Sequence, residues 1–336
     1  MKYISGKILT KEGFQKGYLK INENKIIEVE KGISPSRPIV KGLILPTLIN
    51  MHTHIGDSFI KDRGVALPRN IEELVAPPGG IKHKLLKEAS EKEIITGIKK
   101  SIDVMKRNGT KIFCDFRENG ISGIQQLKKA LESSRISPVT LSRPSNLYYN
   151  KKEMDLLLEN SDGIGLSSIS DWDYSEIIKV AKHVKNKKKF FAIHASERVR
   201  EDIDSILDLK PDFLIHMIKA YESDLIRVKE NNIPIVVCTR ANSFFGLRPN
   251  LDLMKKLRIN ILFGTDNAML ATPNILEEIN FVINNFKTFK KSELLFKISY
   301  EPRKVLNLDC NILSPNSKAE FVVVDEKTLK PLYVSA

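Results

Sequence analysis

The sequence predicts an α/β protein built on a (β/α)8 barrel of the TIM type, with a small β-sandwich domain made from the two ends of the chain. Two observations support this prediction. Short apolar, β-rich segments alternate with helical segments eight times between residues 39 and 286. In addition, four of the six histidines fall at the carboxyl ends of these strands, where the active sites of such barrels form.

The eight strand–helix pairs follow one another with short connections. The first strand is expected over residues 39–50, leading into His52 and His54, and its helix over residues 90–108. The other strands are expected at residues 110–116, 136–142, 163–169, 189–194, 212–216, 233–238 and 260–264. Their helices are expected at residues 121–133, 152–160, 174–185, up to about 209, 221–231, 250–257 and 274–286. A long irregular segment over residues 55–83 resembles a lid at the barrel mouth.

The ends of the chain do not follow this period. Residues 1–40 read as short alternating strands, and residues 321–324 form one apolar run closed by Asp325. We therefore expect residues 1–45 and 310–336 to form the small β-domain, and residues 46–309 to form the barrel.

Composition excludes several classes of protein. The chain has 336 residues, of which 42% are hydrophobic and 28% charged, as in ordinary globular proteins. No uncharged apolar run reaches the length of a membrane span, and lysines interrupt the N-terminal segment where a secretory signal would be apolar. The three cysteines form no Cys-x-x-Cys pair, so we expect a reduced, cytoplasmic setting without disulfides.

The net charge is +13, and the lysines are scattered rather than gathered on one arm. Their densest run, residues 182–189, is interpreted as solvated surface, with anionic small molecules or RNA as alternative partners.

The histidine pattern indicates a metal site. His52 and His54 lie two residues apart, so both imidazoles can face the same side of a strand. His194 ends the fifth strand, and Asp266 follows the eighth. Imidazoles with one carboxylate suit zinc, with iron or manganese as alternatives. The simpler interpretations are a histidine packed in the core and a helix N-cap for Asp266.

Glu197 and His216 complete the polar set at the barrel mouth. Glu197 lies three residues after His194, where strand five gives way to a helix, and His216 ends the sixth strand. As an alternative, Glu197 could simply be an acid favoured in the first turn of a helix.

Five segments together resemble the amidohydrolase superfamily, specifically its cytosine, guanine and adenosine-type deaminases and related chlorohydrolases. They are LILPTLINMHTH over residues 43–54, HASE over 194–197, His216, VCTRANSFFG over 237–246, and GTD over 264–266. The resemblance implies that His52, His54, His194 and Asp266 bind one divalent metal, with Zn²⁺ first and Fe²⁺ or Mn²⁺ as alternatives. Strand four lacks the lysine that bridges two metals in dihydroorotases and ureases, which favours a mononuclear site.

The same resemblance implies an activity. A metal-bound hydroxide would deaminate a nitrogen heterocycle such as a purine, pyrimidine, pterin or a related nucleoside or nucleotide. Glu197 matches the proton shuttle, His216 the histidine that holds the attacking water, and Asp266 a second acceptor for its proton.

Substrate contacts are predicted at other strand ends. Arginine forks suit phosphate or carboxylate groups, so an anionic substrate is favoured. The candidate residues are Arg117, Arg143, Arg240, Trp172 and His83. Alternatively, each arginine pairs with a neighbouring acid such as Asp115 or Glu118, and Trp172 anchors its loop.

Three functions therefore remain open at this point. Deamination comes first, because Glu197 can supply the proton that a leaving amine needs. The same fold could instead hydrolyse a cyclic amide or amidine, or remove a halide. A non-catalytic anion or RNA binder is the remote alternative. We expect a small-molecule partner and no membrane, and the sequence leaves a homo-oligomer open.

Overall fold

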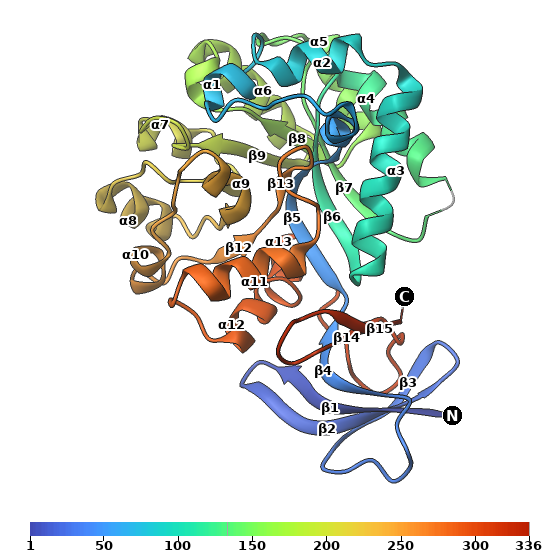
Figure 1. Cartoon of the computed structure of the whole chain (residues 1–336). Coiled ribbons are helices and arrows are strands. Elements are labelled where there is room, and N and C mark those ends of the chain that lie inside the picture. The colour runs from blue at the N-terminus through green and yellow to red at the C-terminus, as the bar shows by residue number, and fades with distance from the viewer. Residues whose placement is uncertain (133, 336) are drawn as a thin grey trace. The chain divides into compact units, whose positions relative to one another are not determined.

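The computed structural model describes residues 1–132 and 134–335 (Figure 1). Nine strands form the larger sheet. They are β5 (Leu48–His54), β6 (Thr110–Arg117), β7 (Ser137–Ser142), β8 (Gly163–Leu166), β9 (Phe190–Ala195), β10 (Phe213–His216), β11 (Ile235–Val237), β12 (Ile261–Phe263) and β13 (Asp266–Asn267). From β5 to β12 neighbouring strands follow the chain order, and β13 lies on the other side of β5.

The strands β12 and β13 act as one interrupted eighth strand. β12 pairs in parallel with β11, whereas β13 pairs in parallel with β5. Between them, the Gly264 amide donates to Val237 O at 3.0 Å and the Thr265 amide to His52 O at 2.9 Å. The sheet thus curls until its last strand meets its first, and the predicted (β/α)8 fold is confirmed.

Helices follow the strands along the chain. They are α3 (Glu91–Arg107), α4 (Gly120–Leu131), α5 (Lys151–Asn160), α6 (Tyr174–Asn186), α7 (Ile203–Asp208), α8 (Glu222–Glu230), α10 (Leu251–Lys256) and α11 (Ile275–Asn285). Most begin with a capping side chain, such as Asn150 on α5 and Asp202 on α7, which accepts a free amide of the first turn. The end of the helix expected over residues 121–133 includes residue 133, which lies outside the described residues.

Several short helices were not expected from the sequence. The segment after β5 contains η1 (Ile55–Arg63), α1 (Ile71–Leu74) and α2 (Ile81–Glu88), although it was predicted as irregular. The others are η2 (Ile169–Asp171), α9 (Thr239–Phe244), α12 (Lys291–Phe296) and α13 (Glu301–Val305). The helix expected to reach residue 209 from the end of β9 begins only at Ile203, because a loop carrying Glu197 comes first.

The single strand predicted over residues 39–50 is wrong. β4 (Val40–Pro46) belongs to the smaller sheet, and β5 begins the barrel sheet. Residues 43–54 are all buried, so hydropathy does not mark the change of sheet. Pro46 marks it chemically, because proline has no amide to continue a ladder.

Both ends of the chain contribute to the smaller sheet, as predicted. Its strands are β1 (Lys2–Thr10), β2 (Gly13–Asn22), β3 (Lys25–Lys31), β4, β14 (Phe321–Val324) and β15 (Pro331–Ser335), in the order β15-β14-β4-β1-β2-β3. β1 and β4 run parallel, and the other pairs are antiparallel. Buried side chains of Ile4, Leu19, Ile44, Phe321 and Val323 belong to one apolar cluster.

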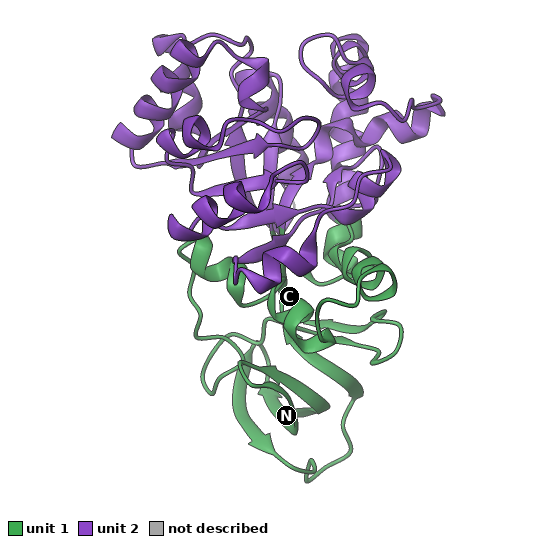
Figure 2. Cartoon of the chain, turned by 90° about the vertical axis from the view of Figure 1, so that its left-hand side faces the viewer, with its two compact units in different colours: residues 1–50, 103–112, 274–336 green, residues 51–102, 113–273 purple. Residues whose placement is uncertain are grey.

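The chain divides into two compact units (Figure 2). One consists of residues 1–50, 103–112 and 274–336, and the other of residues 51–102 and 113–273. The domain boundaries expected near residues 45 and 310 stay a prediction. Among the described residues, no helix is long and apolar enough to cross a membrane.

We expect the smaller sheet to depend on Phe321. The ring is fully buried and stacks on Tyr333 with a centroid distance of 5.8 Å. Phe321→Ala should lower the free energy of unfolding by about 3–5 kcal/mol, because it leaves a cavity in the apolar cluster. Urea unfolding followed by circular dichroism measures the loss. Leu332→Ala, on the half-exposed edge strand β15, is the control and should cost much less. Equal losses in the two variants would contradict this account of the core.

Candidate active site

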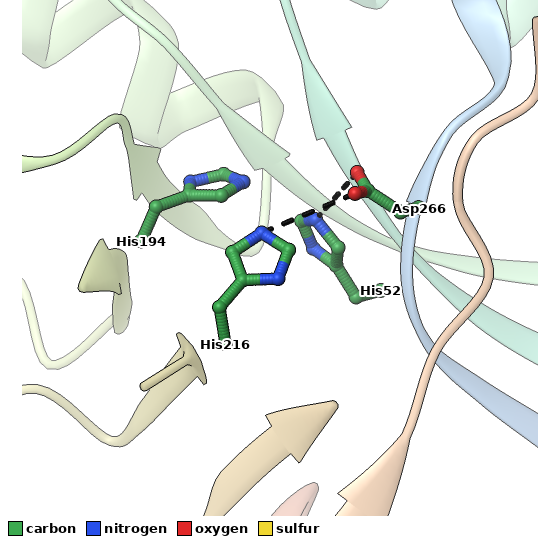
Figure 3. Close-up of side chains that lie close together, drawn as sticks. All are labelled: His52, His194, His216 and Asp266. Atoms are coloured by element: carbon green, nitrogen blue, oxygen red, sulfur yellow. Dashed lines mark ion pairs between the residues drawn. The ribbon is translucent and has the colours of Figure 1, made fainter. Parts of the chain in front are cut away.

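Four polar side chains converge at the carboxyl ends of the barrel strands (Figure 3). His52 comes from β5, His194 from β9, His216 from the end of β10, and Asp266 from the start of β13. Each offers one nitrogen or oxygen atom, and these atoms all lie within 4.8 Å of one another. Groups this close together could hold a single metal ion.

His54 adds a fifth group to this cluster. Its Nε2 lies 3.4 Å from His194 Nε2 and 3.6 Å from Asp266 Oδ1. The structure therefore brings together the whole ligand set implied by the resemblance, with His216 beside it. Which of the histidines would hold a metal together with Asp266 depends on which ring nitrogen of each histidine carries the proton.

His54 and His194 are held in the tautomer that binds metals. His54 Nδ1 lies 2.7 Å from the Glu118 carboxylate, and His194 Nδ1 lies 2.7 Å from the Leu166 carbonyl oxygen. Both partners can only accept, so each Nδ1 carries the proton and donates it. Each Nε2 then keeps its lone pair for the centre of the cluster.

His216 has the opposite arrangement. The Asn242 amide Nδ2 faces His216 Nδ1 at 3.3 Å and donates to Glu197 Oε1 at 3.0 Å. His216 Nδ1 is therefore the acceptor, and its Nε2 carries the proton. That Nε2 lies 3.4 Å from Glu197 Oε2 and 3.9 Å from Asp266 Oδ2. His216 is thus arranged as a hydrogen-bond donor rather than as a ligand.

The buried nitrogens of His52 indicate that the cluster fits a cation. Neither of its ring nitrogens makes a hydrogen bond within the described chain, although the side chain is fully buried. Its Nε2 lies 3.3 Å from Asp266 Oδ1. A buried polar atom without a partner costs about 1–3 kcal/mol, which a bound cation would offset. Three imidazoles and a carboxylate are also a donor set that suits zinc.

Burial keeps the other imidazoles of the cluster neutral. It lowers the pKa of His54 to about 3, with the Lys82 charge adding to the effect. Burial also lowers the pKa of His216 to about 4 and that of His194 well below its usual value. The neutral ring is the form that can coordinate a metal.

The two carboxyl groups of the site differ in electrostatic environment. Burial, with the neighbouring Asp266 charge, raises the pKa of Glu197 well above its usual value. Burial opposes ionisation of Asp266 as well, but the His52 ring beside it holds the pKa of this carboxyl below its usual range. Environments that separate two carboxyl pKa values in this way assign one group as the acid and the other as the anion.

The backbone is strained at three residues that carry or directly precede polar groups of the site. Ser196, His216 and Asp266 have positive φ angles of 46°, 77° and 61°, in the left-handed region that side chains disfavour. Hydrogen bonds hold the loop that carries Glu197. The buried Glu201 carboxylate accepts the Ser196 amide at 2.7 Å and the Ser170 amide at 2.8 Å.

A pocket opens above the cluster, and it distinguishes the predicted substrate contacts that line it from those that do not. Arg143 lines it, together with Lys82, Ser167, Glu197 and Phe245. His83 does not line this pocket. Its Nε2 lies 3.1 Å from Val75 O, and its ring faces a neighbouring groove.

The other three predicted contacts are engaged elsewhere. Arg117 is fully buried and pairs with Asp115 and Glu118, which was the alternative interpretation. Arg240 donates to the Thr272 carbonyl and hydroxyl, and Trp172 Nε1 donates to Ser167. These three side chains therefore bind other parts of the protein. Residues at the ends of parallel strands can stabilise loops as well as take part in function.

Lys82 and Glu118 were missed as site residues, and Asn242 was noted after the seventh strand without being assigned a role. Asn242 falls within the segment 237–246 that carries the family resemblance, so a signal for it was available. Glu118 directly follows β6 but was read only as a counter-ion. Lys82 lies in α2, in a segment with no motif, and only the fold brings it to the pocket.

The chain belongs to the amidohydrolase family, which its residues 43–336 match, and is a hydrolase of carbon–nitrogen bonds. This confirms the resemblance noted in the sequence.

Proteins of similar sequence support this assignment, and a solved structure supports the fold. An uncharacterized protein of Methanocaldococcus jannaschii is 35% identical over 95% of this chain and 85% of its own length. A 5-methylthioadenosine/S-adenosylhomocysteine deaminase of Caldicellulosiruptor saccharolyticus is 26% identical over 79% of this chain and 68% of that protein. The solved structure of an adenosine deaminase of Xanthomonas campestris with bound zinc has a TM-score of 0.73 and 14% identity. It covers 96% of this chain and 84% of that one, and shows a shared fold.

We expect one divalent metal per chain, held by the imidazole–carboxylate cluster. His52→Ala and Asp266→Ala should each lower the bound metal well below one equivalent, because each removes a donor. Elemental analysis of the purified variants measures the content. His183→Gln is the control, since that ring pairs with Asp155 away from the cluster. Full metal content in both site variants would show that the ligands are wrongly assigned.

Proposed function

We propose that the protein is a mononuclear, metal-dependent aminohydrolase that deaminates a nitrogen heterocycle of the purine, pyrimidine or pterin type, free or within a nucleoside or nucleotide. The observation that carries this proposal is the pairing of a metal-ligand set with a separate acid–base set. Asn242 Nδ2 contacts both Glu197 and His216 beside the cluster, His216 Nε2 lies 3.4 Å from Glu197 Oε2, and Glu197 and His216 line the same pocket.

The metal ligands would be His52, His54, His194 and Asp266, with Zn²⁺ as the ion. The tautomers of His54 and His194 favour these rings over His216, and the zinc-bound adenosine deaminase of similar fold supports the choice of metal. A divalent metal held by these residues would act as a Lewis acid and lower the pKa of a bound water.

The acid–base residues account for the proton transfers. Deamination adds water to a ring carbon that carries an amino group, and releases ammonia to leave a carbonyl group. The carboxyl of Glu197 would give its proton to the ring nitrogen. Of the two protons of the attacking water, one would return to Glu197 and the other would pass through it to the departing amine, so that ammonia leaves and a carbonyl group remains. His216 Nε2–H donates to the oxygen as negative charge develops on it. Asn242 holds both side chains in place.

Arg143 favours a substrate with an anionic group. It is 7% exposed, and its guanidinium forms no ion pair within residues 1–132 and 134–335. Its Nε also has no hydrogen-bond partner there. Glu118 and Asp171 attract this buried cation only from beyond ion-pair distance, so a carboxylate or phosphate on the ligand would supply the close partner that it lacks.

The activity can be tested by ammonia release. We expect the zinc-loaded protein to release ammonia from at least one member of a panel of aminopurines, aminopyrimidines, aminopterins and their nucleosides and nucleotides. Glu197→Gln should keep its metal and lower kcat by about 10²–10⁴-fold, because it cannot transfer a proton. Full turnover in the metal-loaded variant would refute the role of Glu197. Chloride release or ring opening without ammonia would instead favour dehalogenation or cyclic-amide hydrolysis.

Arg143 can be tested with matched pairs of substrates. Arg143→Met should raise KM for the anionic member of a pair by about tenfold or more, since one charge-assisted hydrogen bond contributes about 1.5–3 kcal/mol. The uncharged analogue of the same ring is the control and should change little. Steady-state kinetics measure both. An equal rise in KM for the two substrates would show that Arg143 does not bind the anion.

A further inference from the structure

A buried row of charged residues lies directly behind His54. Asp115, Arg117 and Glu118 come from β6 and the residue after it, and Lys82 comes from α2. All four are at most 3% exposed. Two carboxylates and two cations are thus enclosed together, so their formal charges balance.

The hydrogen bonds of this row end on His54. Glu118 Oε1 accepts from Lys82 Nζ at 2.7 Å and lies 2.7 Å from His54 Nδ1. Glu118 Oε2 accepts from Arg117 at 3.2 Å, and Arg117 donates to Asp115 at 3.3 Å. The carboxylate of Glu118 is therefore fixed from two sides, and its orientation fixes the imidazole.

Asp115 holds the backbone around the same histidine. Its Oδ1 accepts the Thr53 hydroxyl at 3.0 Å and the Ile55 amide at 2.9 Å, one residue on each side of His54. The guanidinium packs closely against the backbone here. A Cβ at Gly56 would lie 1.6 Å from Arg117 Nη2, so any larger residue at this position would have to displace the guanidinium.

Lys82 connects this row to another part of the chain. It belongs to the segment between β5 and α3, which contributes part of the wall of the pocket above the cluster. Without Lys82, the two carboxylates would share a single guanidinium, and Glu118 would be free to turn away from His54 toward Arg117.

We propose that Glu118 and Lys82 are positioning residues for the metal centre. Glu118 holds His54 as the Nδ1–H tautomer with Nε2 free, and Lys82 holds Glu118 in place. Metal affinity then depends on the correct packing of α2, although α2 supplies no ligand. The inference rests on the proposed function in one respect, namely that His54 is a metal ligand.

The experiment compares Glu118→Gln, Lys82→Met and the double variant, each in the full-length chain. Competition with a chromophoric chelator measures the zinc dissociation constant. We expect zinc binding to weaken about 10–100-fold in Glu118→Gln and in the double variant, as for other partners of ligating histidines. Lys82→Met should weaken it in the same direction. Lys84→Met is the matched control, because Lys84 is exposed on the same helix, and should stay within about twofold of wild type.

The double variant separates positioning from charge balance. It removes one buried anion and one buried cation together and leaves Arg117 paired with Asp115, so we expect it to fold. Ring ¹⁵N spectra of labelled histidine report the tautomer directly, and only six rings contribute signals. In wild type His54 should be protonated at Nδ1, and the double variant should show a mixture of tautomers.

Each outcome bears on the proposal. Wild-type zinc affinity in the double variant would overturn it, whether or not the thermal midpoint falls, because a structural role alone predicts loss of stability without loss of affinity. Failure of wild type to bind zinc would overturn this inference and the proposed metal site together. Tight zinc binding without ammonia release from any substrate would overturn only the proposed deamination.

Discussion

The pairing of β13 with β5 is the constraint on which the site depends. Asp266 lies beside Thr53 in the register of these two strands, between the two histidines of β5. The Thr265 amide bonded to His52 O fixes the approach of the chain just before the carboxylate. Because the eighth strand is interrupted at residues 264–265, Asp266 can take a left-handed conformation and turn its side chain to the imidazoles.

Hydrogen bonds from outside the cluster then give each histidine a different role. An acceptor behind Nδ1 leaves Nε2 free to bind a metal, as at His54 and His194. A donor behind Nδ1, as Asn242 provides for His216, makes Nε2 a donor itself. Histidines at equivalent strand ends are therefore suited either to coordinate a metal or to polarise the substrate. The hydrogen-bond partner of Nδ1 decides which of the two a given histidine can do.

The predictions from sequence failed where burial is uniform or where one residue type has two uses. The run over residues 43–54 is buried throughout, so no alternation reveals that β4 and β5 belong to different sheets. Arginines at strand ends looked alike in the sequence. Arg117 is neutralised by two acids of its own strand end, whereas Arg143 is buried without an ion pair among the described residues, and only three-dimensional surroundings separate them.

The sequence by itself determined the βα alternation, the strand-end positions of His52, His54, His194, His216 and Asp266, and the family to which the chain belongs. The alternation and the strand-end positions follow from local periodicity, because the carboxyl ends of parallel strands must meet at one end of a barrel. The family follows instead from the resemblance of the five motif segments. The tertiary structure alone decided that Lys82 meets Glu118 behind His54 and that Asn242 joins Glu197 to His216. Those contacts join residues 36, 45 and 26 positions apart, and their geometry depends on how separate elements pack rather than on any spacing along the chain.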